Sequence, residues 1–310
     1  MEINKYIQQK KEIQSFLLNY IENENNDYES FRSLCQNVET QNIQSNKEDY
    51  LHFLFLICEI SKNHHRNINF FEKIEQIISY FKPSINQTFT DIELFNIFKK
   101  SKRILLFLLE NKIIKIDENI TNLILKEKGA EYFFTEIQPF LANDTIKQNL
   151  LNIDSNIFLF YEKNRQKGEN DSYVSQLIRN DSIEDFVIYV NRYNFSLSNK
   201  IKPSIFETNP FLIKNKEPTL IEYASFFGSI QIFQYLLFNN VKLTPSLWLF
   251  AIHGKNAEII HLLEENGLKL NYSFSIECYK EAVKCHHNDI ANYIEINYMN
   301  DKKCEYCYRY

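Results

Sequence analysis

Residues 218–241 read PTLIEYASFFGSIQIFQYLLFNNV, and this stretch decides the fold. Its apolar residues recur every three or four positions on both sides of Gly228, which predicts two short helices joined by a turn. Ala224 lies in the first helix, where a larger side chain would force the two helices apart. Ile232 and Leu236 follow it in the second helix, at offsets of eight and twelve residues. One such pair cannot bury its apolar face alone, so we predict that it stacks against similar neighbours.

The same pattern returns twice downstream. Residues 246–267 read SLWLFAIHGKNAEIIHLLEENG, and residues 277–294 read ECYKEAVKCHHNDIANYI. The small residue is Ala251 in the second copy and Ala282 in the third. Both copies keep the offsets of eight and twelve, at Ile259, Leu263, Ile290 and Ile294. Internal repeats of this length indicate a stack of like helix pairs.

The turn positions are less uniform than the helices. Gly228 ends the first helix of the first copy, and Lys255 and His286 take its place in the later copies. Asn240 follows the second helix, where glycine is usual. Asparagine tolerates the left-handed conformation that this position favours, so we expect Asn240 to adopt it.

Weaker copies extend upstream of these three. The offsets of eight and twelve recur in three further triplets: Ile97, Leu105 and Leu109; Ile178, Phe186 and Val190; and, in a less regular context, Leu125, Phe133 and Ile137. Residues 194–217 contain Pro203 and Pro210 and do not fit a short hairpin, so they predict a long inserted loop. Loops of this length are often functional or mobile.

The three clear copies resemble ankyrin repeats, whose consensus reads TPLHxAAxxGHxEIVxLLLxxGA. The run from about residue 173 to residue 298, with IRNDSIEDF, KPSIFETN and EPTLIEYASFFGSIQIFQYLL, is similar to a large family of divergent ankyrin proteins expanded in trichomonad-type anaerobic protists. That family carries a domain of unknown function that overlaps the repeats. The resemblance implies an ankyrin-like architecture and protein binding, and it implies no catalytic residue.

We predict an all-α protein with a C-terminal solenoid of ankyrin-type helix pairs, preceded by an N-terminal helical bundle or solenoid. The expected order is an N-terminal helical region (1–82), degenerate ankyrin-like pairs (83–193), the inserted loop (194–217), three ankyrin-type repeats (218–298) and a tail (299–310). In the first region, apolar spacing predicts a helix over 68–81 that ends before Pro83. The tail either caps the stack or follows from truncation of a longer array.

Glycine is too sparse for a phosphate-binding loop. The five glycines lie at positions 129, 168, 228, 254 and 267. A phosphate loop needs several glycines within a few residues, so that backbone amides can approach the anion. The chain therefore has no glycine-rich phosphate-binding motif, which argues against the common nucleotide-binding folds, and we expect no cofactor.

The charge balance argues against other classes of partner. The chain has 35 basic and 40 acidic residues, which gives no basic footprint for nucleic acid and no polybasic signal for a membrane surface. No apolar run is long enough to span a membrane, and no secretory leader is visible. We therefore expect a cytoplasmic monomer with reduced cysteines, no membrane span and no nucleic-acid partner.

The C-terminal cysteines and histidines offer one candidate metal site. Cys304 and Cys307 form a C-x2-C pair, and Cys285, His286 or His287 could complete a tetrahedral zinc site. In the competing interpretation, Cys285 to His287 form a helix junction and the tail is frayed, so we predict neither a metal nor catalytic residues. The pair His64 and His65 is expected in a solvated loop, and His253 is expected to be isolated.

A protein-binding surface can be placed by geometry. In ankyrin stacks the concave face is formed by the hairpin tips and the exposed side of each first helix. This maps onto Tyr223, Phe226, Phe227, Phe250, His253, Glu281 and Lys284. Alternatively, Phe226 and Phe227 pack beneath the 194–217 loop. The sequence thus predicts a non-enzymatic protein–protein interaction module or scaffold of unknown partner, with a zinc-binding or enzymatic helical protein using the C-terminal Cys and His residues as the alternative.

Overall fold

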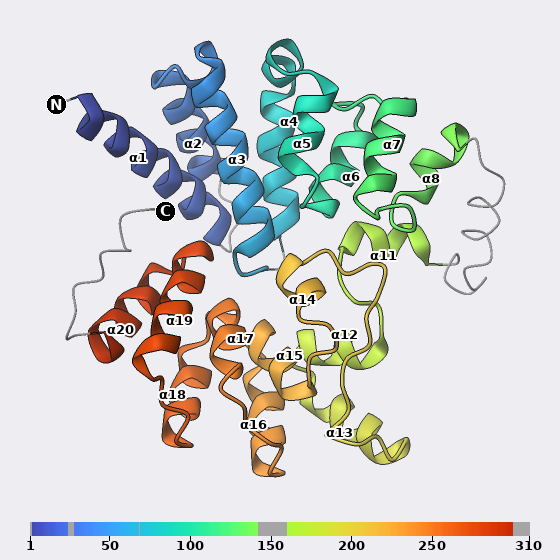
Figure 1. Ribbon diagram of the computed structural model, residues 1–310, viewed down its shortest axis with the longest axis vertical. Helices are drawn as coiled ribbons and strands as arrows, with labels where there is room; N and C mark the ends of the chain where they lie inside the picture. Colours follow the sequence, from blue (N-terminus) through green and yellow to red (C-terminus); the bar gives the residue numbers. More distant parts are fainter. Residues whose placement is uncertain (1, 24–27, 68, 142–159, 300–310) are drawn as a thin grey trace. The chain divides into compact units, whose positions relative to one another are not determined.

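The computed structural model describes residues 2–23, 28–67, 69–141 and 160–299, and these ranges form helices joined by turns and loops, the longest of which precedes α14 (Pro210–Lys214) (Figure 1). They contain no β-strand, only an isolated antiparallel bridge between Lys200 and Thr219. The all-α prediction is confirmed. Among the described helices, none is long and apolar enough to cross a membrane. The chain forms two compact units: residues 1–62 with 66–168, and residues 63–65 with 169–310.

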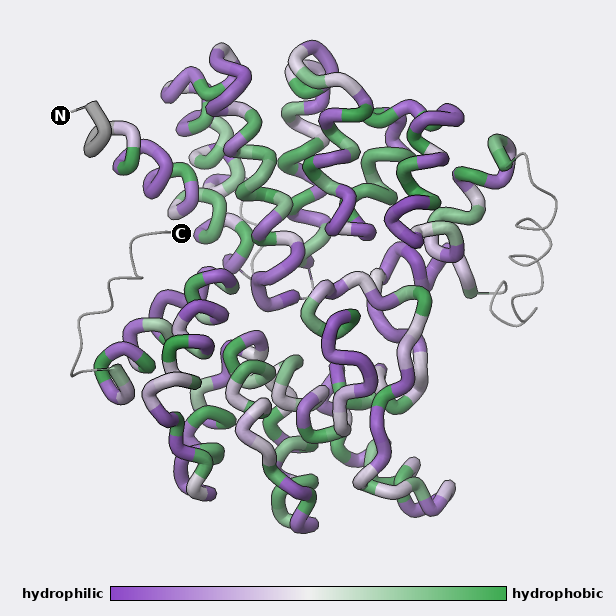
Figure 2. Tube along the Cα trace, in the orientation of Figure 1, coloured by the Kyte–Doolittle hydropathy of each residue, from purple (hydrophilic) through white to green (hydrophobic). Residues whose placement is uncertain are grey.

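The first unit is a succession of helices, most of which bury one side. They are α1 (Glu2–Glu22), α2 (Tyr28–Thr40), α3 (Lys47–Asn63), α4 (Phe70–Thr88), α5 (Asp91–Phe98), α6 (Lys102–Glu110), α7 (Glu118–Lys126), α8 (Phe134–Ile137) and α11 (Tyr161–Lys167), with 3-10 turns at Ile43–Ser45 and Gln138–Phe140. Helix α1 packs on α2 and α4, and α6 packs on α4, α5 and α11. Hydrophobic and hydrophilic residues alternate along these helices, as one-sided burial requires (Figure 2).

The prediction that a helix ends before Pro83 is wrong. Helix α4 continues through Pro83 to Thr88. Proline removes one backbone hydrogen bond from the helix interior. Phe81 and Ile85, on either side of it, are both buried, and the packing of this face offsets the lost bond. Tertiary contacts therefore override the local signal at this position.

The second unit contains four helix pairs. They are α12 (Tyr173–Arg179) with α13 (Ile183–Arg192), α15 (Leu220–Phe227) with α16 (Ile230–Phe238), α17 (Leu247–Gly254) with α18 (Ala257–Glu265), and α19 (Tyr272–Lys284) with α20 (Asn288–Tyr298). The first helices of the pairs pack side by side in the order α12, α15, α17 and α19. The second helices do the same in the order α13, α16 and α18. The pairs therefore stack in chain order.

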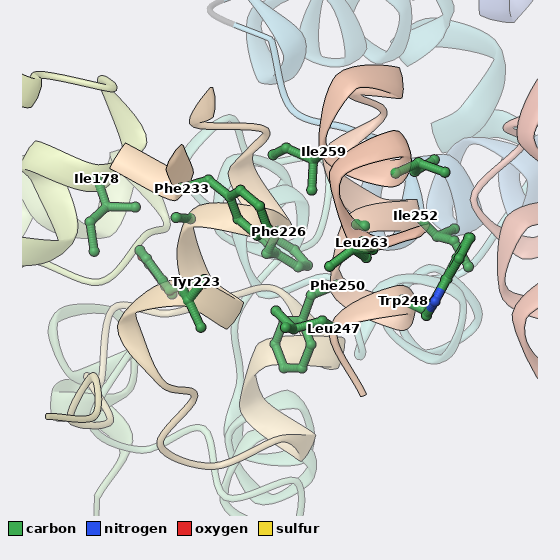
Figure 3. Close-up of a cluster of buried hydrophobic side chains, with 14 of the residues drawn as sticks. Ile178, Tyr223, Phe226, Phe233, Leu247, Trp248, Phe250, Ile252, Ile259 and Leu263 are labelled. Carbon is green, nitrogen blue, oxygen red and sulfur yellow. The ribbon is translucent and has the colours of Figure 1, made fainter. Parts of the chain in front are cut away.

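The residues that define the repeat line the interior of this stack. Ala224, Ala251 and Ala282 are all buried, and the residues twelve positions later are buried too. In the upstream pair, Ile178 and its partners at the same offsets are also buried, so this weaker copy is a real helix pair. Figure 3 shows Ile178, Ile259 and Leu263 among the buried side chains.

The other two upstream triplets differ from each other. Ile97, Leu105 and Leu109 are buried in the pair formed by α5 and α6. Phe133 and Ile137 are buried as well, but α8 is a single turn of four residues. Leu125 is partly buried, and within the described residues this stretch has one helical turn where a complete pair has a second helix.

All four turns within the pairs contain a left-handed residue. The φ angles are 47° at Asp181, 70° at Gly228, 50° at Lys255 and 58° at His286. Asn240 is also left-handed, with φ of 56°, as predicted. A non-glycine residue in this region costs about 1 kcal/mol, so the packing of the stack has to offset that cost.

The residue after the turn reaches back to the preceding pair. Ser229 Oγ donates to the Ile178 carbonyl at 2.6 Å, and Asn256 Nδ2 donates to the Gly228 carbonyl at 3.0 Å. His287 Nδ1 lies 2.8 Å from the carbonyl oxygen of Ile252. These polar contacts fix the spacing between successive pairs where the side chains are buried.

Candidate interaction surface and adjacent histidine cluster

Four of the seven predicted surface residues are buried. Tyr223, Phe226, Phe250 and His253 expose 1%, 5%, 4% and 2% of their surface. The expectation that these side chains are exposed is therefore wrong. Figure 3 shows the three aromatic residues within the hydrophobic core.

The inserted segment covers these residues. It contains the short helix α14 (Pro210–Lys214), whose Phe211 stacks on Phe226 with ring centroids 5.8 Å apart. The Phe211 ring also lies 5.0 Å from that of Phe250 and 4.2 Å from that of His253. The alternative interpretation, packing beneath residues 194–217, is thus confirmed for Phe226.

An arginine from the first pair holds Tyr223. Arg179 Nη1 donates to the Tyr223 hydroxyl at 3.0 Å, and Arg179 Nε pairs with Glu169 at 2.8 Å. The guanidinium also lies 5.9 Å from the ring centre of Phe227, which is partly buried. Burial and the Arg179 contact leave Tyr223 as a structural residue that joins the first two pairs.

Glu281 and Lys284 keep access to solvent, as the partly buried Phe227 does. Lys284 is exposed, and its Nζ lies 3.0 Å from Glu281 Oε1. The same carboxylate oxygen lies 2.8 Å from Nε2 of the buried His253. Burial alone would raise the pKa of Glu281, but the hydrogen bond from His253 and the charges nearby lower it to about 2. Glu281 is therefore ionised at neutral pH.

Exposed aromatic residues gather instead on the first helix pair. Tyr173 and Tyr193 expose 56% and 63% of their surface. The Tyr189 ring lies 5.5 Å from Tyr173, 5.0 Å from Tyr193 and 5.3 Å from Phe195. We call these four residues the tyrosine patch. The sequence prediction did not include the tyrosine patch, because it considered only the first helices of the three clearest repeats, and the patch lies one pair upstream. Phe238, at the end of α16, is exposed to 86%.

Histidines from distant parts of the sequence gather within the second unit. His64 is 4% exposed, and its Nδ1 lies 2.8 Å from the Cys285 carbonyl oxygen. His65 Nδ1 lies 3.2 Å from the His253 carbonyl oxygen, and the His64 and His287 rings are 5.1 Å apart. The expected solvated loop is therefore wrong for His64, and His253 is not isolated. Burial lowers the pKa of His65 to about 4 and that of His287 to about 2, which keeps both rings neutral at neutral pH.

The predicted zinc set is only partly testable. Cys304 and Cys307 lie outside the described residues. His286 occupies the left-handed turn between α19 and α20, and His287 is buried with its Nδ1 against the Ile252 carbonyl. The three residues from Cys285 to His287 thus do form a helix junction. Cys285 Sγ instead faces the ring of His253, at 3.5 Å from Nδ1 and 3.7 Å from Nε2.

The short basic cluster between α5 and α6 is paired with carboxylates. Lys99 and Lys100 both contact Glu127, at 3.3 and 2.7 Å. Arg103 pairs with Glu75. Much of the positive charge of this turn is therefore matched within the first unit.

No protein-family model matches the chain. No curated protein matches it, and no solved structure does.

Proposed function

We propose that this protein is a non-enzymatic interaction module built on ankyrin-type helix pairs, which binds a protein through the tyrosine patch. The single observation that carries this proposal is the pair of exposed tyrosines, Tyr173 and Tyr193, which lie against the partly buried rings of Tyr189 and Phe195 at the first helix pair. Tyrosines are frequent anchors of protein interfaces, because each offers a large apolar ring with a polar end.

The ankyrin-type assignment rests on shared register. Four pairs each have a left-handed turn residue, and the residue that follows it reaches back in three of them. His287 stands at the position of the consensus histidine and contacts Ile252 of the preceding pair. In a stack of repeats, the side chains on the surface can differ from those of other repeats while the buried core stays the same. Repeat proteins bind partners through such surfaces.

We further propose that the protein acts as a cytoplasmic monomer. The described cysteines Cys35, Cys58, Cys278 and Cys285 are buried free thiols, which suits a reducing compartment. Light scattering of the purified full chain tests the monomer directly.

The experiment compares three full-length chains as baits in affinity purification with mass spectrometry. They are the wild type, the double variant Tyr173→Ala and Tyr193→Ala, and the matched control Tyr272→Ala. Tyr272 is also a tyrosine at the start of a helix, exposed to 42%. We expect a protein that the wild type and the control retain and the double variant loses. Purified, that partner should bind the double variant at least about tenfold more weakly.

Fluorescence of Trp248, the chain's one tryptophan, checks that each bait is folded. Equal recovery of the same proteins by all three folded baits would contradict the patch as the binding surface. Turnover of a substrate by the purified chain would contradict the non-enzymatic assignment.

A further inference from the structure

Three potential metal donors meet where α17 and α19 pack together. His253 comes from α17, Glu281 from α19, and Cys285 from the end of α19. Their ligand atoms all lie within 4.8 Å of one another. His253 Nε2 is 2.8 Å from Glu281 Oε1 and 3.7 Å from Cys285 Sγ.

The His253 ring lies between two groups of the protein. Its Nε2 is 2.8 Å from Glu281 Oε1, and the ring also forms a hydrogen bond with the backbone of Asn63. A metal ion at Nε2 would replace the proton that this nitrogen shares with the Glu281 carboxylate, while the contact with Asn63 would hold the ring in place.

We propose that His253, Glu281 and Cys285 bind a zinc ion. A thiolate, an imidazole and a carboxylate together are typical zinc ligands, whereas calcium and magnesium prefer oxygen alone. The other ring nitrogen of a zinc-bound histidine usually donates to a backbone carbonyl or carboxylate, a role that Asn63 fills here. This site is distinct from any that uses Cys304 and Cys307.

One donor distance matches a tetrahedral ion, and the others require small movements. Zn–S of about 2.3 Å and Zn–N of about 2.0 Å place the nitrogen and sulfur about 3.5 Å apart, close to the 3.7 Å between His253 Nε2 and Cys285 Sγ. Because Sγ lies 3.5 Å from Nδ1, the His253 ring has to turn on binding, and the 2.8 Å between Nε2 and Glu281 Oε1 has to widen. Three protein donors leave one coordination position for water.

The surroundings hold the donors and still admit an ion. The His253 ring is packed against Phe211 and Phe226, at centroid distances of 4.2 and 5.0 Å. Glu281 retains 17% side-chain exposure, so the ion reaches the site along its carboxylate. Two events accompany binding: Cys285 releases its thiol proton to solvent, and the exposed Lys284 ammonium moves away from Glu281 Oε1.

The test is a titration of the metal-stripped full chain with Co²⁺, followed by competition with Zn²⁺. We expect one equivalent bound, a cobalt–thiolate charge-transfer absorption, and loss of that absorption in Cys285→Ala. The matched control is Cys278→Ala, which removes a buried thiol of the same helix outside the cluster and should leave the absorption unchanged. The double variant Cys304→Ser and Cys307→Ser should leave it unchanged as well.

Glu281→Gln provides a second measurement if Cys285→Ala fails to fold. Glu281 is partly exposed, so we expect this variant to keep the fold. We expect it to weaken Co²⁺ binding at least about tenfold while Trp248 fluorescence stays native. The proposal is overturned if the wild type binds no ion, if folded Cys285→Ala or Glu281→Gln binds as the wild type does, or if the charge-transfer absorption depends on Cys304 and Cys307.

Discussion

Two of the five glycines meet across neighbouring turns. A Cβ on Gly254 would lie 2.1 Å from the Ser225 carbonyl oxygen and 2.9 Å from the Gly228 nitrogen. A Cβ on Gly228 would lie 2.7 Å from the Gly254 carbonyl oxygen. The second and third pairs therefore approach backbone to backbone. Gly228 also needs its left-handed φ, whereas Gly254 is required for space alone.

We expect Gly254→Ala to lower the free energy of unfolding of the second unit by about 1–3 kcal/mol, because backbone atoms have to move apart. Urea unfolding followed by Trp248 fluorescence measures this change. Gly267→Ala is the control: its Cβ meets nothing within 4 Å, although its φ of 81° carries a cost of about 1 kcal/mol. A smaller effect for Gly254→Ala than for Gly267→Ala would contradict the close approach.

A buried lysine of α4 caps the C-terminal end of α1. Lys73 in α4 is 1% exposed, and its Nζ donates to the carbonyls of Tyr20 at 3.0 Å and Ile21 at 3.4 Å. It also donates to the Asn23 carbonyl. The last carbonyls of a helix have no partner within the helix, so this ammonium satisfies them while burial lowers its own pKa.

Lys73→Met keeps the length of the side chain and removes the donor. We expect a loss of about 2–3 kcal/mol in the stability of the first unit, because buried carbonyls lose a charged partner. Hydrogen exchange at the end of α1 should show the loss locally. Lys82→Met in the same helix removes a partly exposed lysine that donates to the Asn111 carbonyl, and it should cost less than about 1 kcal/mol. Equal exchange in the two variants would refute the capping role.

At the scale of elements, the inserted segment packs on the stack. Asn209 Oδ1 accepts from the backbone nitrogens of Phe211 and Leu212, at 2.9 and 3.3 Å, and so starts helix α14. The Ile201 nitrogen donates to the Pro218 carbonyl at 2.8 Å, which closes the segment at its base. Phe211 then covers the aromatic side chains of α15 and α17. The segment is a structural part of the second unit.

Phe211→Ala should release this segment. We expect a loss of about 3–5 kcal/mol from the removal of a buried ring, and faster limited proteolysis within residues 194–217. Ile213→Ala is the matched control, because Ile213 lies in the same short helix and is 42% exposed. Similar cleavage rates in the two variants would show that Phe211 does not hold the segment.

At the scale of the molecule, the four helix pairs share one core. Buried residues from Val174 in α12 to Met299 after α20 form a single hydrophobic cluster. Each pair contacts its neighbours, so a defect in one pair should weaken the others through their shared interfaces. The second unit is therefore expected to unfold cooperatively.

Ile178→Ala tests this cooperativity. Ile178 is fully buried in the first pair, and Trp248 lies in the third, with its Nε1 donating to the Leu268 carbonyl at 2.7 Å. We expect the unfolding midpoint seen at Trp248 to fall by the equivalent of about 2–4 kcal/mol. The control Ile188→Ala, at a site 56% exposed, should change it by less than about 0.5 kcal/mol. An unchanged midpoint in Ile178→Ala would mean that the pairs unfold independently.

The sequence by itself determined the all-α class and, in the second unit, the four helix pairs and the spacing of their buried residues. Helical periodicity is a local property, and a small residue such as Ala224 marks where two helices must approach. The offsets to Ile232 and Leu236 follow from the same geometry. These features therefore survive even in a pair as divergent as α12 and α13.

Only the tertiary structure decided which faces are covered and which side chains meet. Phe211 buries aromatic residues that periodicity alone would leave exposed, and burial carries α4 through Pro83. His64 and Cys285 are separated by 221 positions yet meet at 2.8 Å, and no local pattern encodes such a contact. The residues predicted to form the binding surface are mostly buried, and the candidate surface is the tyrosine patch instead. His253, predicted to be isolated, contacts Glu281 and Cys285. Burial depends on the chain as a whole, whereas helix formation depends mainly on near neighbours.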